Sequence, residues 1–470
     1  MHMQQNGGSS TAVMELGPIY MKPIPTKPEP ITDVAARGPS RQTSSRDSDG
    51  SGLELGDGPP PDTAAEAVQR WNYPRKNITR VAACFWCFVV MGANDAAYGP
   101  LIPYIQAHHG LTYLVVSLIF LTPAVGYTSA AFLNNMIHLK LGQRGVALMC
   151  SGCHILAYVL MAVHPPYPVM IVAFMIAGFG NGIADAAWNA YITNMERANE
   201  LLGFLHGLYG AGAVLSPLIA TTMITKANLP WYTFYYLMIG MAVLELISSG
   251  FCFWTATARD YRESISKHSS TSNGSLKEAL FKRPGARVTW LCALFLLGYV
   301  GAEVALGGWI VEFMIQVRQG EPFASGMTAT GFWLGLAIGR VVLGFITPRI
   351  GEKRAIMIYL PLTMGLELLF WLVPQFIVSA IAVGLQGFFL GPLFPAVIVA
   401  VSKLLPRHLH VSAIGFAAAF GGSGAAILPF AVGAIAQAKG VQVLQPIILS
   451  ILGIILVFWI ALPRMDKKKE

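Results

Sequence analysis

The sequence predicts an all-α polytopic membrane protein in which twelve transmembrane helices form two parallel six-helix halves. Three observations lead to this fold class. Hydrophobic residues make up 54% of the chain and charged residues only 12%, whereas a soluble domain carries about 25% charged residues. From residue 78 onward, long apolar stretches alternate with short polar breaks, and about 20 apolar residues span a bilayer. The two halves also repeat one pattern of small residues.

The segment over residues 1–77 precedes the first apolar stretch and is rich in Gly, Ser, Pro, Thr and Asp. A segment of this composition cannot bury enough apolar surface to become ordered. We therefore expect a disordered cytosolic tail there. A second short cytosolic tail, over residues 464–470, is expected after the last apolar stretch.

The apolar stretches between these tails define two bundles of six predicted helices. An N-terminal bundle covers residues 78–257 and a C-terminal bundle covers 287–463. A charged, Ser-rich cytosolic loop over 258–286 joins them. The expected helices lie at residues 78–107, 112–138, 144–163, 167–194, 200–225, 231–257, 287–317, 324–348, 353–373, 375–403, 408–438 and 441–463.

The positively charged residues predict the orientation of these helices. Lys and Arg near helix ends number 23 on the face with both termini and the central loop, against 3 on the opposite face. Such an excess is typical of cytosolic loops. Both termini are therefore expected in the cytosol, with the plasma membrane as the expected location. Because the positive residues are divided among short loops, the net charge of +8 does not indicate a nucleic-acid surface.

The six cysteines all lie inside or at the edges of apolar runs, where a thiol packs as a small hydrophobic group. Two Cys-x-x-Cys spacings occur, at Cys84 and Cys87 and at Cys150 and Cys153. Each lies on a predicted helix with no expected acidic or histidine partner nearby. We therefore expect no disulfide framework, no metal site and no cofactor.

The small residues of the two halves match at a nearly constant offset. Gly126 matches Gly335, and Gly178-Phe179 matches Gly387-Phe388, each 209 residues later. On the fifth and eleventh helices the offset becomes 212, as for Gly212 and Gly424. Small residues let helices approach closely. The constant offset predicts two parallel repeats of six helices.

Parallel six-helix repeats are the plan of the major facilitator superfamily, and several segments of this chain resemble it. The breaks after helices 2 and 8 are similar to its cytosolic gating loop, in which a glycine is followed by basic residues. The aspartate of that loop is replaced by Pro348 in the second copy. The gating-loop residues implied by the resemblance are Gly142, Arg144, Arg349, Gly351 and Lys353.

Within the superfamily, the chain resembles most the fucose permeases and the sodium-dependent glucose transporter-like proteins. Asn94-Asp95 on helix 1 and Asp185 with Asn189 on helix 4 are similar to that branch's motifs. Asp185 is one methylene shorter than the glutamate of the family pattern, and His206 lies near an expected asparagine. The resemblance implies that Asp95 and Asp185 form a proton-linked pair.

The two aspartates also suggest a mechanism by themselves. An ionised carboxylate at the bilayer centre costs at least about 2.5 kcal/mol, so it is neutralised, paired or functional. Both aspartates lie within a few residues of a span's centre, where an alternating-access transporter keeps its site. A buried carboxyl group takes up and releases its proton closer to neutral pH than an exposed one does. The alternative is a carboxyl group that serves helix packing through hydrogen bonds.

Further polar and aromatic residues are candidates for substrate binding. Glu303 corresponds to Asn94 in the repeat, so it is expected to face the same cavity. For Arg340, substrate binding, pairing with a carboxylate and extension toward the cytosolic edge all remain open. Glu245 and Glu367 are expected to have structural roles, because their helices are peripheral. The substrate-binding candidates are Asn94, Asn181, Asn189, Trp188, His206, Tyr209, Glu303 and Arg340.

These features favour a secondary active transporter, driven by protons, that moves a small polar solute such as a sugar. One alternative is export of a small organic metabolite or drug by proton antiport. Another is a non-transporting nutrient sensor that signals through the N-terminal tail. No enzyme motif is found at an aqueous helix end. The expected partners are a small-molecule substrate, protons and the lipid bilayer, and a monomer is compatible with the sequence.

Overall fold

The computed structural model describes residues 69–266, 278–282, 284–406 and 409–463. Their secondary structure is helical, with one isolated bridge between Gln69 and Met195. The first helix begins at Arg75, three residues before the expected span. Residues 1–68 of the expected N-terminal tail lie outside the described residues. The same holds for residues 267–277 and 283 of the central loop and for the tail over 464–470.

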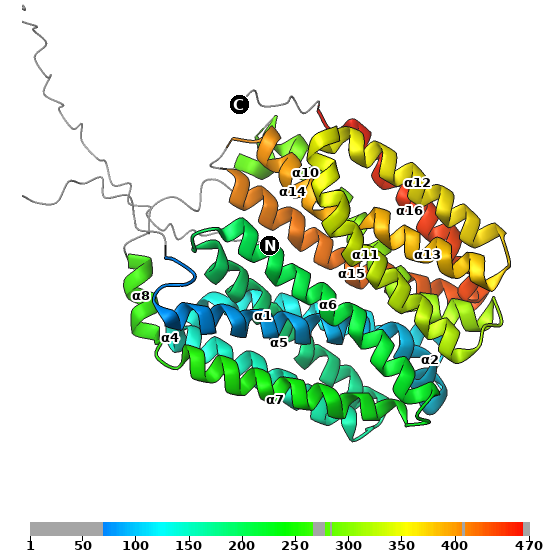
Figure 1. The fold of residues 1–470 in the computed structure, drawn as a ribbon, viewed down its shortest axis with the longest axis horizontal. Coiled ribbons are helices and arrows are strands. Elements are labelled where there is room, and N and C mark those ends of the chain that lie inside the picture. Colours follow the sequence, from blue (N-terminus) through cyan, green and yellow to red (C-terminus); the bar gives the residue numbers. More distant parts are fainter. Residues whose placement is uncertain (1–68, 267–277, 283, 407–408, 464–470) are drawn as a thin grey trace, which may run out of the picture. The chain divides into compact units, whose positions relative to one another are not determined.

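The first half contains helices of very different length (Figure 1). Its first two helices are bent by 48° at Ala97 and together form one span. A short helix, α8 (Ala258–Ser266), follows this half where a loop was expected. The helices of the first half are α1 (Arg75–Ala96), α2 (Tyr98–His109), α3 (Tyr113–Val116), α4 (Leu118–Ala162), α5 (Tyr167–Thr193), α6 (Ala198–Thr225), η1 (Trp231–Thr233) and α7 (Phe234–Phe253).

The second half also consists of membrane-spanning helices, which run from green to red in Figure 1. Its fourth span is divided into two helices, as the first span of the other half is. The helices are α10 (Gly285–Gln316), α11 (Pro322–Ile350), α12 (Glu352–Leu372), α13 (Phe376–Leu390), α14 (Leu393–Leu404), α15 (His410–Lys439), η3 (Val441–Val443) and α16 (Leu444–Ala461).

Helix α4 contains two membrane spans. Ten described helices are long and apolar enough to cross a membrane, and the bent pair α1 and α2 makes eleven. With 45 residues, α4 would extend about 67 Å, roughly twice the thickness of the hydrocarbon core. Gly142 interrupts it with φ 68° and ψ −173°, a conformation that side chains rarely permit. The expected second and third spans are therefore both present, and a one-residue break replaces the expected gap over 139–143.

The repeat is visible in how the helices pack. A Cβ on Gly126 would lie 2.1 Å from the carbonyl oxygen of Met175, and one on Gly335 would lie 2.0 Å from that of Gly384. Both residues of the second pair come 209 positions after those of the first. The same backbone approach therefore joins α4 to α5 and α11 to α13. This confirms the two-half architecture expected from the glycine offset.

The two halves meet at the membrane face opposite the central loop. Tyr113 donates a hydrogen bond to Glu312, near the end of α10 that is far from that loop (3.1 Å). A Cβ on Gly99 would lie 2.3 Å from the carbonyl oxygen of Gly307, so α2 and α10 touch by their backbones. Toward the central loop, a Cβ on Gly203 or Gly415 would meet no atom within 4 Å. These contacts between the described halves therefore lie at the face opposite the central loop.

Candidate functional site

Asp95 lies at the centre of a polar cluster built by three helices. Its carboxylate accepts hydrogen bonds from the amide of Asn94 (3.0 Å), the amide of Asn181 on α5 (3.2 Å) and the hydroxyl of Tyr209 on α6 (2.9 Å). Asn94 also donates to the hydroxyl oxygen of Tyr98 (3.1 Å). Three donors satisfy the oxygen atoms of an ionised carboxylate well. When the carboxylate takes up a proton, these hydrogen bonds can break.

Local sequence explains why Asp95 is held in this position. It precedes the bend at Ala97, and Pro100 and Pro103 follow the bend without the N–H groups that would extend the helix ladder. One turn earlier, a Cβ on Gly92 would lie 2.0 Å from the carbonyl oxygen of Tyr209. The absent side chain lets α6 approach α1 closely enough for the tyrosine hydroxyl to reach the carboxylate.

The cluster extends from Asp95 to a buried histidine and glutamate. The side-chain oxygen of Asn181 faces Nε2 of His154 on α4 (2.9 Å), and Nδ1 of that ring faces Oε2 of Glu245 on α7 (2.9 Å). The side chains of His154 and Glu245 are 0% and 1% exposed. A continuous path of hydrogen bonds therefore joins Asp95 to a carboxylate on a peripheral helix.

His154 was not predicted from the sequence, and Glu245 was predicted to have a structural role without a named partner. The expectation that the Cys-x-x-Cys pairs have no acidic or histidine partner is wrong for Cys150, whose thiol donates to Glu245 (3.3 Å) and lies 4.0 Å from His154. The signal was present, because residues 150 and 154 are four apart and share one helix face. Glu245 comes from a helix 91 residues later, and no local pattern brings it there.

One group of described side chains could offer ligands to a metal ion. Ligand atoms of Cys87, Cys150 and Glu245 lie within 4.8 Å of one another, and the two sulfur atoms are 3.9 Å apart. Both oxygens of Glu245 already have protein partners, His154 and Cys150. The carboxylate is therefore satisfied by hydrogen bonds from the protein itself.

Asp185 belongs to a second cluster, one helical turn further along α5. The amide of Asn189 donates to its carboxylate (2.8 Å), and the side-chain oxygen of Asn189 faces Nε2 of His206 on α6 (3.2 Å). His206 is exposed, and its ring meets that of Phe88 edge-on at 5.5 Å. The small and polar residues of α5 have different neighbours here. Gly178 and Gly182 face α4, whereas Asn181 and Asn189 donate to Asp95 and Asp185.

The second half contributes an ion pair. Arg340 on α11 lies 3.3 Å from Glu303 on α10, with the two side chains 26% and 8% exposed. Of the roles left open for Arg340, the structure shows pairing with a carboxylate. A Cβ on Gly210, the residue after Tyr209, would lie 3.8 Å from the Cβ of Ala337, three residues before Arg340. The two halves therefore approach each other beside this ion pair.

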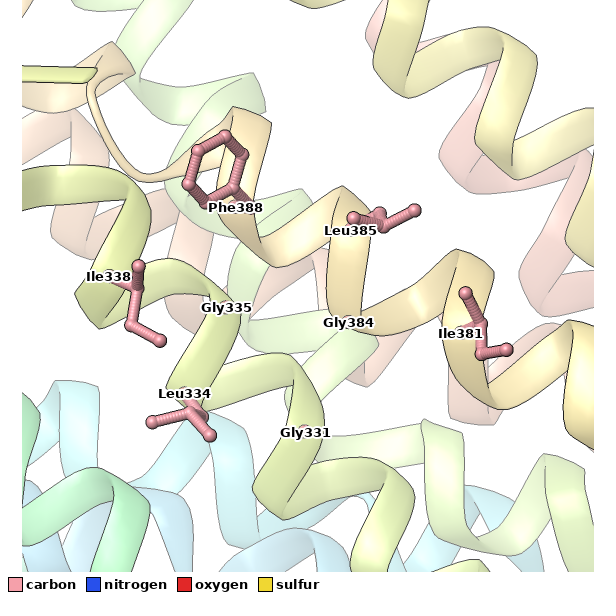
Figure 2. Close-up of a pocket in the computed structure, with 8 residues that line it drawn as sticks. All are labelled: Gly331, Leu334, Gly335, Ile338, Ile381, Gly384, Leu385 and Phe388. Carbon is pink, nitrogen blue, oxygen red and sulfur yellow. The ribbon is translucent and has the colours of Figure 1, made fainter. Parts of the chain in front are cut away.

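Trp188 does not join these clusters. Its ring is 1% exposed and stacks on Phe253 at 4.6 Å between ring centres. The structure places this candidate in the packing between α5 and α7. A groove between α11 and α13, shown in Figure 2, is also distinct from the clusters. Only glycine, leucine, isoleucine and phenylalanine residues line it, so it has no polar side chain for a polar solute.

The predicted gating-loop residues form two related turns. Gly142 and Gly351 have φ values of 68° and 93°, so each supplies the positive φ that reverses the chain between two spans. The backbone N–H of Arg144 donates to Ala256, and its guanidinium lies over the Trp254 ring at 5.1 Å. In the second turn, Lys353 donates to the carbonyl oxygens of Ile460, Leu462 and Pro463, while Arg349 is exposed.

Comparison with known families gives one match that covers both halves. The model described as Major Facilitator Superfamily matches residues 84–321 and 302–470. Bypass of stop codon protein 6 of Saccharomyces cerevisiae is 30% identical over 417 residues, which cover 83% of this chain and 84% of that protein. Glucose/mannose transporter GlcP of Bacillus subtilis is 22% identical over 351 residues, covering 74% and 85%.

Solved structures share the fold at lower identity. The crystal structure of a D-xylose-proton symporter matches with a TM-score of 0.67 and 13% identity, covering 83% of this chain and 99% of that one. The transporter FucP, crystallised in the outward conformation, matches with a TM-score of 0.57 and 17% identity, covering 82% and 98%. At these identities the likeness concerns the arrangement of the helices.

Proposed function

This chain belongs to the major facilitator superfamily, and from that premise we propose that it is a proton-coupled symporter of a sugar-like polyhydroxyl solute. It is a multi-pass membrane protein of a transporter family and not an enzyme, and it fits the branch that contains the fucose permease. In the proposed cycle, the two halves rock around a site between them, so that the site opens to one side of the membrane at a time.

The cluster around Asp95 carries this proposal. A carboxylate with three hydrogen-bond donors inside a transmembrane bundle can exist charged, although charge at that depth is otherwise unfavourable. It can also exist as a neutral acid. A group that is stable in both states can bind a proton from one side of the membrane and release it to the other. We assign Asp95 and Asp185 this role.

The polar groups beside the aspartates suit a solute with several hydroxyl groups. Arg340 and Glu303 in one half, and Asn189, His206 and Tyr209 in the other, offer both donors and acceptors. Sugar hydroxyls donate and accept, so both kinds of group are needed. The names of the relatives, a glucose/mannose transporter and a D-xylose-proton symporter, support this class of solute.

The packing of the halves supports alternating access. The described contacts between them gather at the face opposite the central loop, as between Tyr113 and Glu312. Gly203 and Gly415, near the other face, have open space around them. With the central loop in the cytosol, as the positive charges favour, this arrangement is open to the inside. We place both termini in the cytosol and the protein in the plasma membrane.

Transport in proteoliposomes tests this function. Purified protein is reconstituted, an inward proton gradient is imposed, and accumulation of radiolabelled D-glucose, D-mannose and D-xylose is measured. We expect accumulation that an uncoupler abolishes, and we expect the Asp95→Asn variant to exchange sugar without accumulating it. Accumulation by both Asp95→Asn and Asp185→Asn at the level of the unaltered protein would contradict the proposal. Proton efflux coupled to solute uptake would indicate antiport instead.

A further inference from the structure

The buried pair of His154 and Glu245 has no role in the mechanism above. The two residues come from α4 and α7, and their atoms Nδ1 and Oε2 lie 2.9 Å apart in the interior of the first half. An ion pair buried this deeply is weak evidence for stability, because desolvation offsets much of the attraction between the charges. Its connection to Asp95 through Asn181 suggests a different role.

The positions of the protons along this connection follow from the donors and acceptors. While Asp95 is ionised it can only accept, so the amide nitrogen of Asn181 faces it and the amide oxygen faces His154. Nε2 of His154 must therefore donate. Nδ1 faces Glu245, and one proton lies between these two groups. Because the other oxygen of Glu245 accepts from Cys150, the carboxylate is favoured in its charged form and His154 in its imidazolium form.

We propose that the His154–Glu245 pair is a positioning and charge-compensating unit that stabilises the ionised state of Asp95 through Asn181. This inference rests on the proposed role of Asp95 as a proton-binding group. The imidazolium polarises the amide of Asn181, whose N–H group donates to the carboxylate of Asp95. Glu245 keeps the imidazolium charged in a dry environment. Together the two residues set the pH at which Asp95 releases its proton.

The surroundings of His154 contain few other groups that could change this balance. Its own helix supplies Cys150 and Tyr158, whose ring stacks on the imidazole at 5.8 Å. From α1 come Asp95, connected through Asn181, and the thiol of Cys87, connected through Cys150. Helix α5 supplies Asn181, and α7 supplies Glu245. In this hydrogen-bond network of described residues, Glu245 and Asp95 are the carboxylates.

Infrared titration of the full-length protein in lipid tests this inference without a substrate. The carbonyl band of protonated carboxylic acids is followed against pH, and the part lost in Asp95→Asn is assigned to Asp95. In Glu245→Gln the imidazolium lacks its counter-ion and loses its proton, so Asp95 should hold its own proton to higher pH. We expect its midpoint to move upward by up to about one pH unit, because the positive charge lost from His154 lies nearer to Asp95 along this path than the negative charge lost with Glu245. His154→Gln should move it in the same direction.

Glu367→Gln is the matched control. Glu367 on α12 is also a fully buried carboxyl group in a membrane helix, but it accepts a hydrogen bond from Gln386 of α13, away from Asp95. This variant should leave the Asp95 midpoint unchanged. An unchanged midpoint in both Glu245→Gln and His154→Gln would overturn the inference, as would a spectrum in which Asp95→Asn removes no titrating band.

A measurement on the unaltered protein covers the case in which the variants do not fold. Nitrogen NMR of protein labelled at histidine reports whether both ring nitrogens of His154 carry protons. We expect the imidazolium form at pH values where Asp95 is ionised, and a neutral ring there would overturn the inference. If these signals behave as expected but sugar uptake is independent of protons, the proposed transport function fails and the charge-compensating unit stands.

Discussion

Removing the hydroxyl group of Tyr209 should change how tightly Asp95 holds its proton. Tyr209→Phe deletes one of the three donors to the carboxylate, at 2.9 Å, and leaves the ring in place. A hydrogen bond to a charged group contributes about 1.5 to 3 kcal/mol. Because one pKa unit corresponds to about 1.4 kcal/mol, the loss should move proton binding by about one to two pH units. The donor stabilises the ionised form, so its loss favours the protonated form and the midpoint moves to higher pH.

The pH dependence of D-glucose uptake in proteoliposomes measures this change. We expect the pH of half-maximal uptake to rise by about one to two units in Tyr209→Phe, while exchange of sugar at equal concentrations continues. Tyr167→Phe is the control. It removes a tyrosine hydroxyl in the same half, but one that donates to the backbone oxygen of Val115 at 2.8 Å. Equal pH profiles for Tyr209→Phe and the unaltered protein would refute the role of this donor, and a shift in Tyr167→Phe would show that the effect is not specific.

Three further predictions concern packing, substrate binding and orientation. Gly126→Ala and Gly335→Ala should each destabilise the protein by about 1 to 3 kcal/mol, because the new Cβ would lie within 2.1 Å of a backbone oxygen. Thermal unfolding in detergent checks this, and Gly152→Ala, at a position with open space, should leave the transition unchanged. Arg340→Gln should weaken sugar binding about tenfold or more, the scale of one lost charged hydrogen bond, whereas Arg349→Gln at the exposed end of the same helix should not. Equal sugar-binding constants for the two variants would show that Arg340 does not contribute to sugar binding. A cysteine introduced at exposed Arg349 should react with an impermeant thiol reagent in inverted vesicles and not in intact cells, and the reverse result would overturn the orientation.

Much of the architecture could be predicted from the sequence, because the bilayer makes span formation a local property. A stretch of about 20 apolar residues must satisfy its own backbone hydrogen bonds, so it forms a helix wherever it occurs. The glycine offset between Gly126 and Gly335 predicted the repeat, since close helix packing needs small residues at the same places in both halves. Asp95 and Asp185 stood out for a similar reason, as carboxyl groups inside apolar segments need an explanation.

The neighbours of these carboxyl groups were decided only by the tertiary structure. Asp95, Asn181, His154 and Glu245 come from four helices, and which side of each helix faces the others depends on its rotation about its axis. In a soluble protein the polar face of a helix reveals that rotation. In a membrane, the lipid-facing and the packed sides are both apolar, so the hydrophobic pattern contains little information about it. The sequence by itself therefore determined the spans, the two halves and the buried acids, whereas packing between distant helices decided which of these groups are joined by hydrogen bonds.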